Sequence, residues 1–111
     1  MHRVKKSWNQ AQATSTKRDN LQKWSTQYLG LDDNDAEALP QAQPVTIFPA
    51  RPRGFVEFDI TRAVLQWRCG APNYGVVIRA TNELQPGRDI RFTSTVGKNK
   101  WQHPYAMVLC V

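Results

Sequence analysis

Carboxylates form the densest group of reactive side chains in this sequence. Four of them fall within the segment DDNDAE: Asp32, Asp33, Asp35 and Glu37. Calcium prefers oxygen ligands of this kind, but an EF-hand loop also needs a central glycine and a distant bidentate glutamate, and the segment has neither. We therefore expect a solvated acidic loop and no cofactor, with bound calcium as the alternative.

Side chains suited to catalysis are sparse. His2 is terminal, His103 precedes a proline, and no serine or cysteine stands in a nucleophile-elbow motif. Cys69 and Cys110 match neither zinc-site nor thioredoxin-type spacing. We predict a protein that is not an enzyme and has neither catalytic residues nor a metal site. A disulfide between the two cysteines is the open alternative to free thiols, since it depends on an oxidising compartment.

Aromatic side chains are the second group that could bind a ligand. Sugar rings present apolar faces that stack on Trp and Tyr, while flanking polar groups fix the hydroxyls. Trp24, Tyr28 and Trp101 lie in expected loops and are therefore candidate ligand contacts, with a role in closing the core as the alternative. By their places in the pattern, Trp8 and Trp67 are expected to be structural.

The charge balance favours an anionic partner, because the formal net charge is +6. The basic residues are dispersed over many segments, without the basic helix or tail of a nucleic-acid-binding protein, so we predict no nucleic-acid partner. The longest apolar strings are strand-sized, which predicts no membrane span. The N-terminal MHRVKKSWNQ has no apolar stretch after its charges, so it does not read as a signal peptide.

The elements that would position these groups are clearest from residue 55 onward. Residues 55–60 alternate apolar and polar, the period of a half-buried strand that includes Asp59. Thr61 can cap a short helix, and Gly70 can end it. Asn73 and Gly75 then form a turn into a second strand.

Residues 55–111 therefore read as strand, helix and three further strands, preceded by an irregular, Trp- and Pro-rich part over 4–54. Strands without intervening long helices predict an all-β fold, an antiparallel, jelly-roll-like β-sandwich with one short crossover helix. We expect one domain over 1–111.

Two arginines are the candidate anion-binding pair of this fold. A hairpin centred on 84–86 would place Arg79 and Arg91 opposite or diagonal to one another, on the outward face. The planar guanidinium matches a carboxylate or sulfate, so both are candidate ligand-binding residues. The alternative is that the two side chains point into water or pair with Glu83 or Asp89.

Several motifs together resemble a known family. The segments FDITRAVLQW, NYGVVIRA, IRFTST and HPYAMVLCV, with Trp8 and Trp24 before them, are similar to DNRLRE-type β-sandwich domains, classed as carbohydrate-binding module family 96. Ser15 stands where that family usually has Trp. Family members also carry strands before the segment that begins at Val4, so the resemblance implies a sandwich incomplete at its N-terminus. The residues from Phe55 onward also resemble the propeptide arm of transforming growth factor β relatives.

The resemblance implies a non-catalytic, secreted or extracellular module that binds an acidic polysaccharide or cell-surface glycan. The missing part of a longer parent chain would be a further partner. The alternative is a structural protein-interaction arm, propeptide-like or an assembly subunit, with no affinity for glycans.

Overall fold

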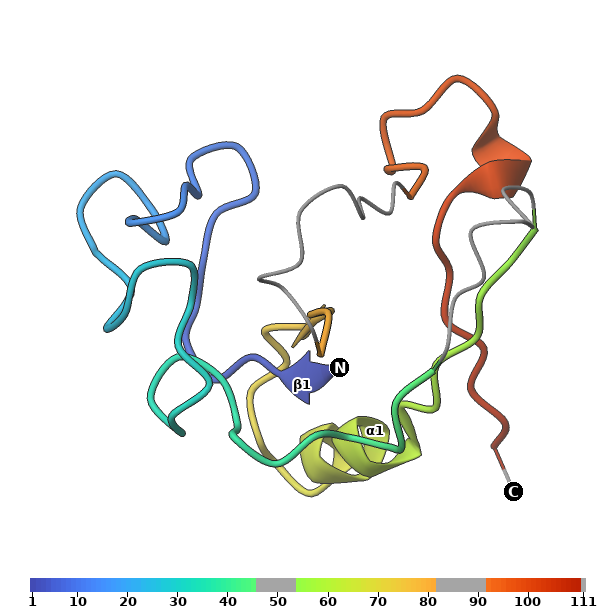
Figure 1. Ribbon diagram of the computed structural model, residues 1–111. Helices are drawn as coiled ribbons and strands as arrows, with labels where there is room; N and C mark the ends of the chain where they lie inside the picture. Colours follow the sequence, from blue (N-terminus) through green and yellow to red (C-terminus); the bar gives the residue numbers. More distant parts are fainter. Residues whose placement is uncertain (46–53, 82–91, 111) are drawn as a thin grey trace. The chain divides into compact units, whose positions relative to one another are not determined.

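The computed structural model describes residues 1–45, 54–81 and 92–110 of the 111-residue chain. The chain divides into two compact units, 1–81 and 82–111, each considered by itself below. The described residues of the first unit contain β1 (His2–Arg3), α1 (Thr61–Arg68) and β2 (Val76–Val77). Those of the second contain one 3-10 helix, η1 (Lys100–Gln102). Figure 1 labels β1 and α1, and most of the described chain around them forms neither helix nor strand.

The predicted β-sandwich is wrong. Among the described residues there is one sheet, of two antiparallel strands of two residues each, and one α-helix. Residues 54–60 and 104–110, both predicted to contain strands, form no helix or strand here. Alternation of apolar and polar residues makes a segment compatible with a sheet, but a strand exists only where a neighbouring backbone satisfies its amides. The predicted strand at 45–48 lies outside the described residues except for Val45. Of the predicted strand at 89–95, residues 89–91 lie outside them and residues 92–95 form no strand.

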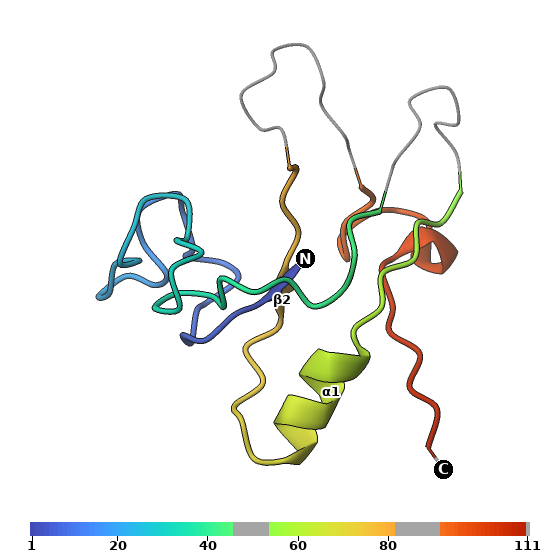
Figure 2. The ribbon, with the colours of Figure 1, turned by 60° about the horizontal axis from the view of Figure 1, so that its bottom comes forward.

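The N-terminal segment is the centre of the first unit. β1 pairs with β2 in the register His2↔Val77 and Arg3↔Val76, and the Val4 amide continues the pairing by donating to the Gly75 carbonyl at 2.9 Å. Figure 2 shows the chain leaving α1, turning and running back past the helix to β2.

The other edge of the N-terminal segment pairs with residues 35–37. The Lys5 amide donates to the Asp35 carbonyl at 2.7 Å, and the Glu37 amide donates to the Arg3 carbonyl at 3.0 Å. The first five residues are thus bonded along both edges, although the sequence showed no strand pattern there.

The helix α1 begins one residue earlier than expected, and the predicted Thr61 cap is not formed. Thr61 is the first helical residue, and the N-cap position is Ile60, which makes no side-chain cap bond. The Asp59 carboxylate instead accepts the Thr61 amide at 2.9 Å. Asp59 therefore satisfies an amide that the first helical turn leaves open.

The predicted end of α1 and the turn after it are confirmed. Gly70 has φ +102°, and its amide donates to the Trp67 carbonyl at 3.1 Å, which closes the helix. Gly75 has φ +82°, and its amide donates to the Asn73 side-chain oxygen at 3.0 Å. The turn thus uses both residues that the sequence singled out.

The buried centre of the first unit is small and partly polar. Its buried apolar residues, among those described, are Val4, Ala36 and Ala63. Glu37 lies beside them and joins three segments: its carboxylate accepts from Arg3 at 2.9 Å, from Gln66 at 3.0 Å and from Gln41 at 3.1 Å. Burial of the Glu37 carboxylate would raise its pKa, but the bonds from Arg3 and Gln66 outweigh burial and lower it.

None of the helices in the described ranges is long and apolar enough to cross a membrane, in agreement with the expectation of no membrane span.

Candidate functional site

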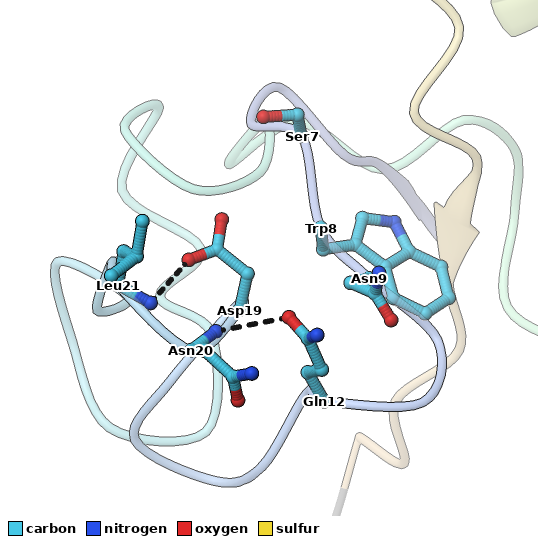
Figure 3. A pocket seen from close by; sticks show the side chains of 7 residues that line it. All are labelled: Ser7, Trp8, Asn9, Gln12, Asp19, Asn20 and Leu21. Atoms are coloured by element: carbon cyan, nitrogen blue, oxygen red, sulfur yellow. Dashed lines mark hydrogen bonds between the residues drawn. The ribbon is translucent and has the colours of Figure 1, made fainter.

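The candidate site is a hollow in the loop between β1 and residue 24. Its volume is about 540 Å³, within the range of about 300–1,000 Å³ typical of small-ligand pockets. Seven residues line it: Ser7, Trp8, Asn9, Gln12, Asp19, Asn20 and Leu21. Figure 3 shows the Trp8 indole on one side and Asp19 and Leu21 on the other, with Gln12 between them.

Backbone pairing brings the two halves of this loop together. The Asn9 amide donates to the Arg18 carbonyl at 2.8 Å, and the Arg18 amide donates to the Gln22 carbonyl at 3.0 Å. Gln12 then reaches across the hollow, where its side-chain oxygen accepts the Asn20 amide at 3.1 Å. Residues ten or more positions apart therefore line one hollow.

The Trp8 indole is held by one edge while much of its surface stays in solvent. Its Nε1 donates to the Tyr74 carbonyl at 2.8 Å, which ties the loop to the segment before β2. The residue is nevertheless 45% exposed. An oriented and accessible aromatic face is what stacking on an apolar ligand surface needs.

Asp19 supplies the one carboxylate of the hollow. Its Oδ1 accepts the Leu21 amide at 2.8 Å and the Gln22 amide at 2.7 Å, which fixes the side chain. Oδ2 has no hydrogen-bond partner in the ranges described. The carboxylate can therefore still accept a hydrogen bond from a ligand.

Three carboxamide side chains complete the polar lining. Asn9 uses its oxygen for the Ala11 amide at 2.9 Å, and Gln12 uses its oxygen for Asn20. The side-chain NH₂ groups of Asn9 and Gln12, and the whole side-chain carboxamide of Asn20, bond to no other group in the described part of the chain. The hollow thus offers several donors, one carboxylate oxygen and one aromatic face.

The hollow was not predicted from the sequence. Trp8 was expected to be structural, and its Nε1 bond agrees with that, but almost half of the residue is exposed. The available signal was the density of carboxamides around the tryptophan, since Asn9, Gln10, Gln12, Asn20 and Gln22 all fall between residues 8 and 22.

The aromatic residues predicted to contact ligand do not line this hollow. Trp24 is half-buried, and its Nε1 donates to the Thr14 carbonyl at 3.1 Å, so it braces the loop from within. Tyr28 is 68% exposed and has φ +64°. Trp101 is 73% exposed and belongs to η1 of the second unit.

The predicted Arg79 and Arg91 pair is only half described. Arg79 follows β2 and is half-buried, whereas Arg91 lies outside the described residues. Trp67, predicted to pack, is half-buried in α1. Cys69 and Cys110 are both exposed free thiols, so the disulfide alternative is not observed.

The acidic segment is more ordered than the expected solvated loop. Asp35 is fully buried, and its carboxylate accepts the amides of Ser25 at 2.9 Å, Gly30 at 3.0 Å and Thr26 at 3.2 Å. Burial of Asp35 would raise its pKa, but these amide bonds lower it to about 2. No three acidic, histidine or cysteine side chains gather into a metal-binding group among the residues described.

A second hollow, of about 620 Å³, lies in the first unit and is lined by Ala42, Gln43, Pro44, Val45, Glu57, Phe58 and Asp59. It offers two carboxylates against one carboxamide, and Asp59 is already used to hold the start of α1.

Comparison with family models, with curated proteins and with solved structures found no match for this chain.

Proposed function

We propose that this chain is a non-catalytic carbohydrate-binding module and that the Trp8 hollow is its sugar-binding subsite. The observation that carries the proposal is the exposed Trp8 indole face beside unpartnered side-chain amide groups. A sugar ring has apolar C–H faces and a rim of hydroxyls. The aromatic face would stack on the ring, and the amides would bond the rim.

Binding without catalysis suits the chemistry of the hollow. Its one carboxylate, that of Asp19, has no second carboxylate beside it among the lining residues. Glycoside hydrolysis in most families uses two carboxyl groups about 5–10 Å apart. The hollow therefore has the groups to recognise a sugar but not that pair.

An acidic polysaccharide as the natural polymer remains a prediction. It depends on the net charge of +6, on the family resemblance and on the predicted pairing of Arg79 with Arg91, which lies outside the described residues. Extracellular localisation depends on the same resemblance. Both belong to the proposal and are tested with it.

The test is isothermal titration of the full chain with soluble neutral and uronate oligosaccharides. Trp8→Ala should lower the affinity for the tightest-binding oligosaccharide at least tenfold. The reason is that the exposed part of the Trp8 indole, roughly half of the residue's surface, no longer contacts the sugar. Trp8→Tyr keeps an aromatic face and should retain most of the affinity. Circular dichroism of each variant checks that the fold is kept.

Trp101→Ala is the matched comparison, since Trp101 is an exposed tryptophan of the second unit. We expect it to leave affinity unchanged. If Trp101→Ala lost affinity and Trp8→Ala did not, the sugar-binding site would be at η1 and not at the Trp8 hollow. Absence of binding to every oligosaccharide would refute the proposed function.

A second candidate function is the protein-interaction arm, and exposed apolar residues near the C-terminus favour it. Met107 is 74% exposed, Val108 53% and Leu109 85%. Contiguous exposed apolar residues with strand-forming side chains favour pairing with another chain. Sedimentation velocity over a dilution series tests this: Leu109→Lys should reduce association, and a wild-type monomer at all concentrations would exclude self-association.

A further inference from the structure

We infer that the Trp8 hollow selects an uncharged sugar unit over a uronate, and that Asp19 is the residue that sets this preference. This inference rests on the proposed function, because it concerns which sugar the hollow accepts. It applies to the unit in the hollow, so it is compatible with a polymer that carries acidic units elsewhere.

The charge of the lining carries the argument. Asp19 is the only lining residue with a charged side chain. The one charge among the lining side chains is therefore negative, although the whole chain carries +6. A carboxylate brought within about 6 Å of Asp19 would be repelled, and at an effective dielectric constant near 40 this repulsion would weaken its binding by up to about tenfold.

The nearest basic residue along the chain forms no ion pair with Asp19 in the described ranges. Arg18 precedes Asp19 but is not a lining residue. Its Nη1 donates to the Ser7 carbonyl at 3.0 Å and lies 3.3 Å from the Ser7 hydroxyl oxygen. Its guanidinium is thus bonded to a lining residue, Ser7, and not to Asp19.

The unused hydrogen-bonding groups match hydroxyls. The free Oδ2 of Asp19 is an acceptor, and hydroxyl donors on a neutral sugar would satisfy it. The carboxylate of a uronate has no hydrogen to offer. The amide groups of Asn9, Gln12 and Asn20 would bond sugar oxygens of either kind, so they do not discriminate.

The experiment compares two ligands that differ at one carbon. Oligogalactose and oligogalacturonate of equal length, the second carrying carboxylates in place of C6 hydroxymethyl groups, are titrated against wild type and Asp19→Asn at 0.15 M salt. The asparagine oxygen can still accept the Leu21 and Gln22 amides, so the loop is kept while the charge is removed. Asp33→Asn is the matched control, because Asp33 is an exposed acidic residue of the same unit that does not line the hollow.

We expect wild type to prefer the neutral oligomer. Asp19→Asn should shift the ratio of the two affinities by roughly fivefold to tenfold toward the uronate. Asp33→Asn should leave the ratio unchanged. If the NMR spectrum of Asp19→Asn shows that the variant is unfolded, Asn20→Asp is used instead. It adds a second carboxylate to the hollow and should weaken uronate binding further.

Three results would overturn the inference. They are a wild type that binds the uronate at least as well as the neutral oligomer, an Asp19→Asn ratio equal to that of wild type, and the same ratio shift in Asp33→Asn. Binding of neither oligomer, nor of any other sugar in the panel, would instead overturn the proposed function and the inference with it.

Discussion

Replacing Asp35 by asparagine removes the charge from a fully buried carboxylate of the first unit. Both of its oxygens accept backbone amides: Oδ1 that of Ser25, and Oδ2 those of Thr26 and Gly30. An asparagine has one oxygen and one NH₂ group. Whichever way it is turned, the NH₂ group faces at least one amide donor, so a bond is replaced by a contact between two donors.

The pKa of Asp35 sets the size of the effect. The ordinary value of 3.8 falls to about 2 in the folded chain, against the opposing effect of burial. At about 1.4 kcal/mol per pKa unit, the charged form stabilises this region by about 2 kcal/mol. Lys6 lies 3.4 Å from Oδ1 but is partly exposed, and such a pair adds at most about 1 kcal/mol.

The pH dependence follows from the sign of this change. A carboxyl group with a lowered folded pKa stabilises the fold at pH values above its unfolded pKa. For Asp35 this contribution is complete above about pH 5 and is lost as the pH falls from about 4 toward 2.

Amide hydrogen exchange measured by NMR is the assay, because it reports on this region alone. At neutral pH, Asp35→Asn should speed exchange at Ser25, Thr26 and Gly30 by roughly 30-fold, which corresponds to about 2 kcal/mol. A carbon-13 titration of the wild-type carboxyl groups should place Asp35 near pH 2.

Asp33→Asn is the control, since it removes the same charge from an exposed position and its oxygen can still accept the Ala38 amide. We expect no change in exchange at the three Asp35-bonded amides. Equal effects of the two substitutions, or an Asp35 that titrates near 4, would refute the reasoning.

Two further predictions concern α1. Gly70→Ala places a β-carbon at φ +102° and should destabilise the helix end by about 1–2 kcal/mol, seen as a lower helical signal in circular dichroism; an unchanged signal would contradict this cap. Asp59→Ala should lower the helical signal by freeing the Thr61 amide, whereas Thr61→Ala should lower it less, because Thr61 is the first helical residue and not the N-cap. The opposite order would restore Thr61 as the cap.

Turns and helix ends were predictable because a few neighbouring residues determine them. Gly70 and Gly75 adopt the positive φ that glycine tolerates best, and Asn73 bonds two residues ahead as short polar side chains do. The N-cap lies at Ile60, one residue before the predicted Thr61, and the side chain that bonds the first helical turn is that of Asp59, because FDIT contains two side chains that could do so.

The strands could not be predicted in the same way. The pattern over 55–60 is that of a strand, yet this segment is not one, whereas His2–Arg3 has no such pattern and pairs with Val76–Val77. A strand is made by the neighbour that satisfies its amides, and that neighbour here is over 70 residues away. The sequence alone specifies which segments can be extended, not which of them meet.

The candidate site, like the fold, could be predicted only in part from the sequence. The sequence alone showed that the chain has aromatic side chains that could stack on a sugar and lacks a recognisable catalytic motif. Only the tertiary structure showed that Trp8 is held by Tyr74 with its face exposed, and that the pairing of Asn9 with Arg18 brings Asp19 opposite the indole. Residue types follow directly from the chain, but a binding surface forms only when backbone hydrogen bonds bring distant residues together.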